Sequence, residues 1–190
     1  MPMRGIAEHP AGLTYVPDAL TVPEEAVLLA RFAELETSPV VMRGVASRRR
    51  VRHFGVGYDF ATWGTTTAEE LPPYLLELRR HCRGWAGADP DTFVEALVTC
   101  YPPGATIGWH RDASAFGPLV VGVSLGSDCV MRFQRTAAGG ERRVYEQPLQ
   151  RRSTYVLAGA ARSAWQHSVP AVPDTRWSVT FRQVRRPAGD

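Results

Sequence analysis

The sequence predicts a mainly β protein of the α+β class, a barrel or double-sheet jelly roll with two helices packed against one sheet. A chain of 190 residues is long enough to bury the core of one ordinary domain. Its content of 44% hydrophobic and 22% charged residues is typical of globular proteins. Two amphipathic segments in the first half predict the helices. Short segments rich in Val, Thr, Tyr and Phe then recur between turn sequences, which predicts antiparallel strands.

The first predicted helix spans residues 23–36. It begins with Pro23 and two glutamates, which favour a helix start, and its apolar residues recur at helical spacing. The second spans residues 73–85, with Gly84 as its stop signal. The predicted strands follow at residues 93–101, 106–112, 119–126, 129–135, 142–149, 153–159 and 176–184.

The charged residues and cysteines favour some classes of function, such as polyanion binding, and argue against others. All 22 basic residues are arginine, and they are concentrated in two segments, residues 48–53 with four and residues 141–190 with nine. Such patches suit a polyanion, although charge clusters are also common on solvated surfaces. Three cysteines without a CxxC pair argue against a disulfide framework or a zinc knuckle. No apolar run is long enough to span a membrane, and the start lacks the apolar stretch of a signal peptide, so we expect a cytoplasmic protein without membrane contact.

Two histidines and an aspartate form the candidate metal site. His110 and Asp112 are two apart on a predicted strand, so their side chains would point to the same face. With the distant His167 they match the two-histidine, one-carboxylate triad of non-haem iron(II) oxygenases, in which three coordination positions stay open for co-substrate and O2. The alternative is that the three are polar fillers of a metal-free binding module on a jelly-roll scaffold.

Two arginines form a candidate anion site. Arg176 and Arg182 lie six residues apart on one predicted strand, on the same face as Ser178 and Thr180. Two inward arginines are costly in a narrow barrel unless they meet an acid, and a dicarboxylate is a suitable guest. The alternative, an amphipathic edge strand with its arginines in water, is equally consistent with composition.

Several motifs together resemble the AlkB family of iron(II)- and 2-oxoglutarate-dependent dioxygenases. They run in the family's order from about Arg52 to Arg186, and comprise Tyr101-Pro102-Pro103-Gly104, His110-x-Asp112, Ser124-Leu125-Gly126-Ser127, Arg162 five residues before His167, and Arg176 to Arg182 in RWSVTFR. The resemblance implies a double-stranded β-helix jelly roll with flanking N-terminal helices. It also implies one domain over residues 1–190, comprising an N-terminal helical flank (about 1–50), a substrate-side lid and helix (51–90) and a catalytic core (91–186).

The resemblance implies a role for each candidate residue. His110, Asp112 and His167 would hold Fe(II), and Arg176 would pair with the distal carboxylate of 2-oxoglutarate. The rest of the co-substrate site would comprise Arg182, Tyr101, Ser178 and Thr99, the last standing where the family often has Asn. Arg52, Phe54 and Tyr58 lie in a segment that resembles the substrate-side lid and would meet a phosphate or an extruded base, although each aromatic residue is also a candidate for the core.

The implied activity is oxidative dealkylation of alkylated bases in DNA or RNA, using Fe(II), 2-oxoglutarate and O2, by a monomer that binds single-stranded nucleic acid. Ala113-Ser114-Ala115-Phe116 replaces the acidic residues that commonly follow His-x-Asp in repair members, and resembles the tRNA-modifying branch. Hydroxylation or demethylation of a tRNA base is therefore the first alternative, a protein demethylase is the second, and the metal-free binding module is the third.

Overall fold

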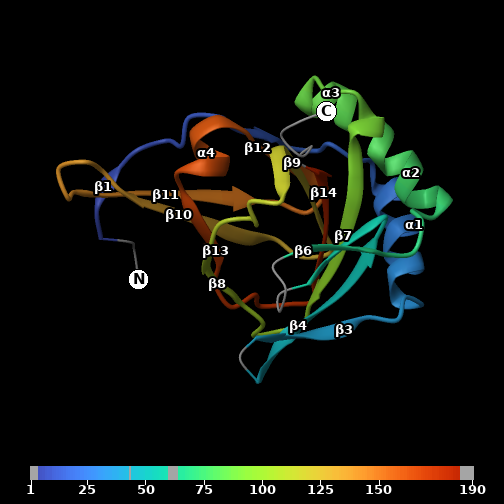
Figure 1. Ribbon diagram of the computed structural model, residues 1–190. Helices are drawn as coiled ribbons and strands as arrows, with labels where there is room; N and C mark the ends of the chain where they lie inside the picture. Colours follow the sequence, from blue (N-terminus) through green and yellow to red (C-terminus); the bar gives the residue numbers. More distant parts are fainter. Residues whose placement is uncertain (1–3, 43, 60–63, 185–190) are drawn as a thin grey trace.

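Two β-sheets face each other and form the body of the protein (Figure 1). The structure is a computed structural model, which describes residues 4–42, 44–59 and 64–184. The seven-stranded sheet has the order β2 (Leu13–Val16), β12 (Ser153–Leu157), β9 (Phe116–Leu125), β14 (Arg176–Val184), β7 (Phe93–Tyr101), β4 (Val45–Phe54) and β3 (Ser38–Met42). The five-stranded sheet has the order β1 (Ile6–Ala7), β11 (Arg142–Leu149), β10 (Cys129–Thr136), β13 (Gln166–Val169) and β8 (Ile107–His110). This arrangement confirms the predicted mainly β jelly roll.

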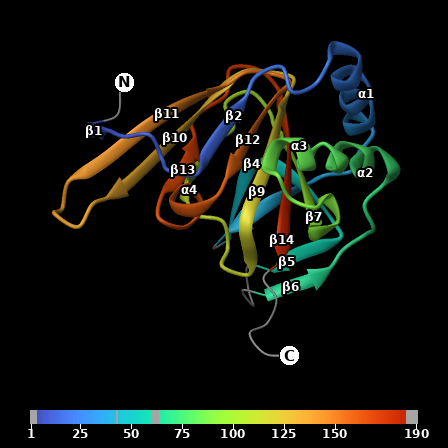
Figure 2. The same cartoon turned by 90° about the horizontal axis from the view of Figure 1, so that it is seen from above.

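Helices α1 (Val22–Ala33), α2 (Pro73–Arg80) and α3 (Cys82–Ala86) lie together beside the seven-stranded sheet (Figures 1 and 2). Thr21 caps α1 with its side chain, and the Glu24 carboxylate accepts a hydrogen bond from the Thr21 N–H in return. Apolar residues of the helices, including Phe32 and Leu75, pack against Val179 and Phe181 of the sheet in one buried cluster. The outer face of the sheet is thereby covered, and the inner face is left for the site.

The structure differs from the prediction in several elements. The second predicted helix is two short helices, α2 and α3. Six strands that were not predicted precede α2 in the described part of the chain, among them the hairpin of β5 (Val56–Asp59) and β6 (Gly64–Thr67). Near the C-terminus, helix α4 (Gly159–Ser163) and strand β13 also escaped prediction, and a 3-10 turn (Pro90–Thr92) precedes β7. No helix in the described part of the chain is long and apolar enough to cross a membrane.

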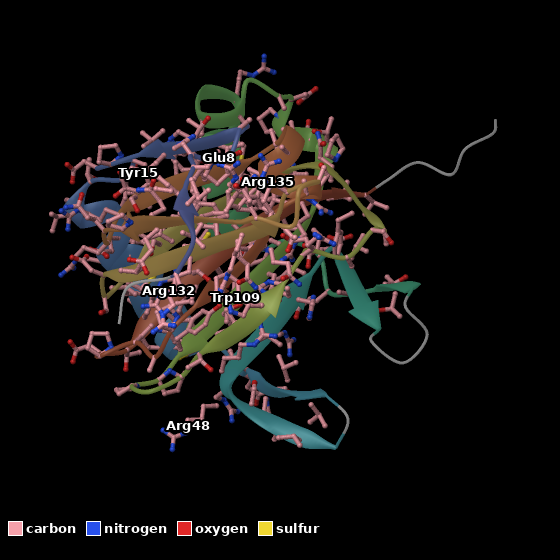
Figure 3. All side chains as sticks on the ribbon, turned by 90° about the vertical axis from the view of Figure 1, so that its left-hand side faces the viewer. Glu8, Tyr15, Arg48, Trp109, Arg132 and Arg135 are labelled. Atoms are coloured by element: carbon pink, nitrogen blue, oxygen red, sulfur yellow. The ribbon has the colours of Figure 1, made fainter. Side chains whose placement is uncertain are left out.

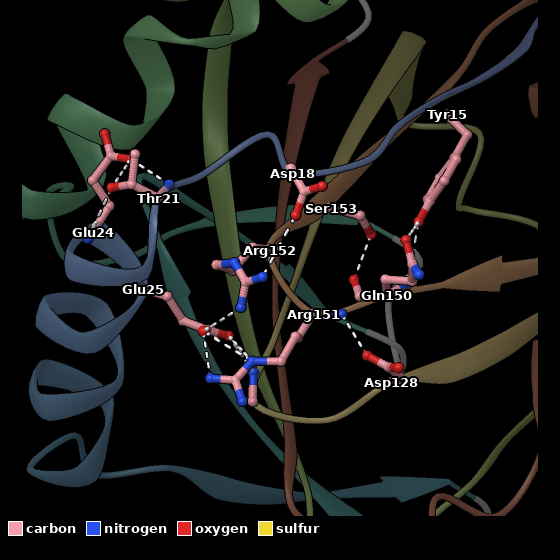
Figure 4. A network of polar contacts seen from close by, with 11 residues as sticks. Tyr15, Asp18, Thr21, Glu24, Glu25, Asp128, Gln150, Arg151, Arg152 and Ser153 are labelled. Carbon is pink, nitrogen blue, oxygen red and sulfur yellow. Dashed lines mark hydrogen bonds and ion pairs between the residues drawn. The ribbon is translucent and has the colours of Figure 1, made fainter.

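A buried carboxylate of α1 connects this helix to the end of β9 and to the turn between β11 and β12 (Figure 4). Glu25 is 1% exposed, and its carboxylate accepts hydrogen bonds from Arg151 Nη2 at 2.6 Å and from the Gly126 N–H at 2.9 Å. Burial alone would raise the pKa of Glu25, but the hydrogen bonds from Arg151 and Gly126 and the nearby Arg152 outweigh it, so the pKa is lowered. The ionised form is therefore the one that stabilises the fold.

We expect Glu25→Gln to lower the free energy of unfolding by about 2 kcal/mol at pH 7, because Arg151 loses a charge-assisted partner. Urea denaturation measures this difference. Since the pKa of Glu25 is lower in the folded than in the unfolded state, its contribution is complete above the unfolded-state pKa and declines as the pH falls through the folded-state value. The stabilities of wild type and variant should therefore converge in acid, and a difference independent of pH would contradict this account.

Candidate active site

The pairing of β13 with β8 brings the two candidate histidines together. His167 is the cross-strand partner of His110, and their ring centroids lie 4.2 Å apart. His167 is buried between the two sheets, where Phe133 of β10 packs 6.1 Å from its ring. Both rings therefore face the interior of the jelly roll, as the sequence predicts.

The Asp112 side chain lies beside the two histidines, but it is positioned by a loop and not by the strand that the sequence predicts. Strand β8 ends at His110, so Asp112 lies beyond it and strand alternation does not direct its side chain. The loop is held by Arg162 of α4, which donates hydrogen bonds to the carbonyl oxygens of Asp112 at 3.2 Å and Ala113 at 2.9 Å. Asp112 Oδ2 lies 3.7 Å from His167 Nε2, which completes the group of three.

The protonation states suit metal ligation. His110 donates a hydrogen bond from Nδ1 to the Gly108 carbonyl at 2.9 Å, so the lone pair of the neutral ring is on Nε2. Burial lowers the pKa of His110, and burial together with His110 lowers the pKa of His167 to about 3. Burial opposes ionisation of Asp112, but Arg182 and the histidines outweigh it and lower its pKa. The site thus offers two neutral imidazoles and one carboxylate at neutral pH.

This donor set fits Fe(II), which is bound by imidazole nitrogens and a carboxylate in the facial-triad enzymes. His167 Nδ1 is buried without a hydrogen-bond partner among the described residues, so no protein group competes for that ring. Asp112 Oδ1, in contrast, accepts a hydrogen bond from Arg182 Nε at 2.8 Å and forms an ion pair with Arg182 Nη2 at 2.7 Å. Within the described ranges no group of three acidic, histidine or cysteine side chains is arranged to hold a metal ion as the structure stands. Because Arg182 binds Asp112 Oδ1, metal binding requires Asp112 to be shared with Arg182.

Arg176 lies at the inner end of the cavity between the sheets. It is 1% exposed, donates from Nε to Ser124 Oγ at 3.2 Å, and lies over the Tyr101 ring with 5.0 Å between its guanidinium carbon and the ring centroid. It forms no ion pair with any carboxylate in the described part of the chain. A buried guanidinium without an acid is costly, so this position suits the carboxylate of a ligand.

The pairing of β14 with β7 places the other residues that line the inner cavity around Arg176. Arg176 pairs with Tyr101, and Ser178 pairs with Thr99. All four side chains are buried and line the inner cavity, while Trp177 and its alternate neighbours pack on the opposite face. The predicted inward face of this strand is thus observed.

Arg182 differs from Arg176 in having two carboxylate partners. Besides Asp112, it donates from Nη1 to Glu95 at 2.9 and 3.2 Å. Glu95 is 0% exposed, and the sequence analysis did not identify it. The available signal was its position: Glu95 lies on the inward face of β7 with Thr99 and Tyr101, opposite an arginine that needs an acid.

A wider outer cavity of about 480 Å³ opens onto the same groups. The residues that it shares with the inner cavity include Arg49, His110, Asp112 and Arg182, and its other lining residues include His53, Glu95, Trp109, Arg111, Ala113 and Ser114. This volume is within the range of small-molecule pockets. The two cavities therefore meet at the candidate metal ligands.

Two of the three predicted lid residues, Arg52 and Phe54, do not line this cavity. Arg52 is paired with Glu69 at 2.6 Å on the surface. Phe54 is 2% exposed and belongs to the core beneath the helices, which argues against base stacking. Tyr58 lies in β5, but its side chain is outside the described residues.

Comparison with known proteins identifies the family. Residues 12–185 match the 2OG-Fe(II) oxygenase superfamily. The chain is 29% identical to the Alkylated DNA repair protein ALKBH8 homolog of Arabidopsis thaliana, over 92% of this chain and 56% of that protein. It is 30% identical to tRNA (carboxymethyluridine(34)-5-O)-methyltransferase ALKBH8 of Macaca fascicularis, over 84% of this chain and 24% of that protein. The chain thus spans about half of the first relative and a quarter of the second.

The fold comparison agrees. The structure of OsALKBH1 superposes with a TM-score of 0.71 at 15% identity, covering 93% of this chain and 98% of that one. A 2OG-Fe(II) oxygenase family oxidoreductase from Burkholderia pseudomallei superposes with a TM-score of 0.62 at 18% identity, covering 97% of each chain. The chain is thus similar to AlkB homologues in sequence and fold. It belongs to the 2OG-Fe(II) oxygenase superfamily, and is a dioxygenase that uses Fe(II), 2-oxoglutarate and O2.

Proposed function

We propose that the protein oxidatively dealkylates alkylated nucleobases in single-stranded DNA or RNA. The observation that carries the proposal is the junction of the two cavities at His110 and Asp112. The inner one ends at a buried arginine that lacks an acid among the described residues, and the outer one is large enough for an extruded base. A carboxylate co-substrate and a base can thus meet at the same ligands.

The inner residues bind and orient. His110, Asp112 and His167 would hold Fe(II), whose chemistry in this superfamily is oxidation of a C–H bond by O2, coupled to decarboxylation of 2-oxoglutarate to succinate. Arg176 would grip the distal carboxylate of the co-substrate with its planar fork. The buried hydroxyls of Thr99 and Ser178 would line the same wall, and the jelly roll around them excludes water.

The outer residues offer contacts for a base and for phosphates. Trp109 is 37% exposed beside His110, so its ring is available for stacking. Figure 3 shows Trp109 with Arg48 and Arg132 on one face of the molecule. Arg49 lines both cavities and forms no ion pair with the described residues, so its charge is free to meet a phosphate. Trp109 and Arg49 replace Arg52 and Phe54 as the substrate side of the proposal.

A tRNA base is the second candidate substrate. Ala113 and Ser114 line the outer cavity at the positions that directly follow the candidate metal ligand Asp112. A small, uncharged wall there leaves room for a base with a bulky substituent. The macaque relative at 30% identity is named as a tRNA methyltransferase, which also favours this candidate.

Mass spectrometry of methylated oligonucleotides tests the proposal. Single-stranded oligonucleotides with 1-methyladenine or 3-methylcytosine would be incubated in air with the protein, Fe(II) and 2-oxoglutarate, and His110→Ala would be the control. We expect the wild type alone to remove one CH2 equivalent from the base, with succinate as co-product. Succinate without a change in either oligonucleotide would contradict base dealkylation of these lesions, and methylated tRNA would then be the substrate to assay.

A further inference from the structure

Glu95 is a fully buried acid whose position requires an explanation. It lies in the middle of the site, on β7, with 0% of its surface exposed. Its carboxylate accepts hydrogen bonds from Arg182 Nη1 and, at 3.3 Å, from His53 Nδ1. Taking a carboxylate out of water is costly unless its partners compensate. The compensation for burying Glu95 comes from these two partners.

Its main partner, Arg182, divides its guanidinium between two acids. Nε and Nη2 bind Asp112 Oδ1, and Nη1 binds both oxygens of Glu95. Since Arg182 holds Oδ1, the other oxygen of Asp112 is the one nearest His167, at 3.7 Å. The orientation of the candidate metal ligand is thus set by Arg182, and the position of Arg182 is set by Glu95.

We propose that Glu95 is a positioning residue for the iron site, an inference that rests on the site described under the proposed function. Glu95 supplies Arg182 with a carboxylate of its own, so that Asp112 can donate electron density to a metal ion while Arg182 remains neutralised. Without the charge of Glu95, Arg182 would depend on Asp112 alone among the described carboxylates, and would compete with the metal for it.

The same carboxylate connects the metal site to the substrate side. His53 lines the outer cavity and its side chain is 25% exposed, while Glu95 behind it is buried. Glu95 therefore fixes one ring nitrogen of a residue that faces the outer cavity. The chain from His53 through Glu95 and Arg182 to Asp112 consists only of contacts between 2.7 and 3.3 Å.

Direct metal titration tests this role. Mn(II), which does not oxidise in air at neutral pH as Fe(II) does, would be titrated into the metal-free protein, with free Mn(II) measured by electron paramagnetic resonance. Because removing a group that orients a metal ligand typically weakens binding 10- to 100-fold, we expect Glu95→Gln to raise the Kd about tenfold. Glu25→Gln is the matched control: it also removes a buried, arginine-bound carboxylate, but one whose partners are Arg151, Arg152 and the Gly126 N–H and not Arg182 or a candidate metal ligand, and it should change the Kd less than twofold.

The outcomes separate the two proposals. Asp112→Ala should abolish Mn(II) binding, and if the wild type fails to bind or this variant binds equally well, the iron site itself is wrong. If the wild type binds and Glu95→Gln binds with the same Kd, only the role of Glu95 is overturned. Should Glu95→Gln not fold, Glu95→Asp decides: its shorter side chain should raise the Kd several-fold, and an unchanged Kd would overturn the role equally.

Discussion

Asp112→Ala is expected to reduce 2-oxoglutarate turnover to the background rate while leaving the fold nearly as stable as that of the wild type. The variant removes the only carboxylate of the proposed metal-binding triad, so the remaining histidines offer two ligands. Arg182 does not become an uncompensated buried cation, because it keeps Glu95 at 2.9 Å. Succinate formation with saturating Fe(II), together with a thermal melt, measures both expectations.

The matched control is Asp91→Ala, which removes an exposed aspartate paired with Arg79 on the surface. It should keep at least half of the wild-type turnover. Wild-type turnover in Asp112→Ala would remove the triad from the account. An inactive Asp112→Ala that also melts like an unfolded chain would contradict the expectation that Glu95 compensates Arg182.

Arg176→Lys is expected to raise the KM for 2-oxoglutarate about 10- to 100-fold, which corresponds to the loss of a charge-assisted hydrogen bond worth about 1.5–3 kcal/mol. Lysine keeps the charge but cannot reproduce the planar fork that grips a carboxylate at two points. The kcat at saturating 2-oxoglutarate should fall much less, because Arg176 lies at the inner end of the cavity and not among the metal ligands. Succinate formation against 2-oxoglutarate concentration gives both parameters.

Arg132→Lys is the control for this exchange, because Arg132 lies on β10 and pairs with Glu146 instead of lining the inner cavity. We expect its KM to remain within twofold of that of the wild type. If Arg176→Lys also left the KM unchanged, the co-substrate carboxylate would have to bind elsewhere.

Strand alternation explains how much of the site the sequence could predict. Arg176, Ser178 and Arg182 lie on the inner face of β14 because a strand alternates its sides regardless of the surrounding fold. The family resemblance, and not this rule, assigned Tyr101 to the co-substrate site; its neighbour across the sheet is Arg176. Local periodicity is sufficient wherever a residue lies inside a regular strand.

The rest of the site depends on contacts that no local pattern encodes. Asp112 lies outside β8 and is held by Arg162, which is 50 residues away in the sequence. His167 belongs to a four-residue strand too short to show a period, and its position follows from its pairing with His110. Glu95 looks like an ordinary polar residue of a strand until β14 places Arg182 opposite it. These residues are brought together by the register between strands, which is a tertiary property.

The same reasoning explains the strands and lid residues that prediction missed. Strand β4 carries the run of arginines from Arg48 to Arg52, and a segment so charged does not look like a strand. It is stable because its two edges pair with β7 and β3, and because Arg48 and Arg50 stay exposed to solvent while Arg49 faces the cavities. Phe54 is the last residue of this strand and packs in the core beneath the helices. The family resemblance had assigned this aromatic residue to the substrate.

The most direct test of the account is to locate the metal. Crystals grown without oxygen in Fe(II) and 2-oxoglutarate would be measured on both sides of the iron absorption edge. The account predicts one anomalous peak coordinated by His110, Asp112 and His167, with the distal carboxylate of 2-oxoglutarate on Arg176. An iron peak held by other residues, or a co-substrate bound away from Arg176, would contradict it.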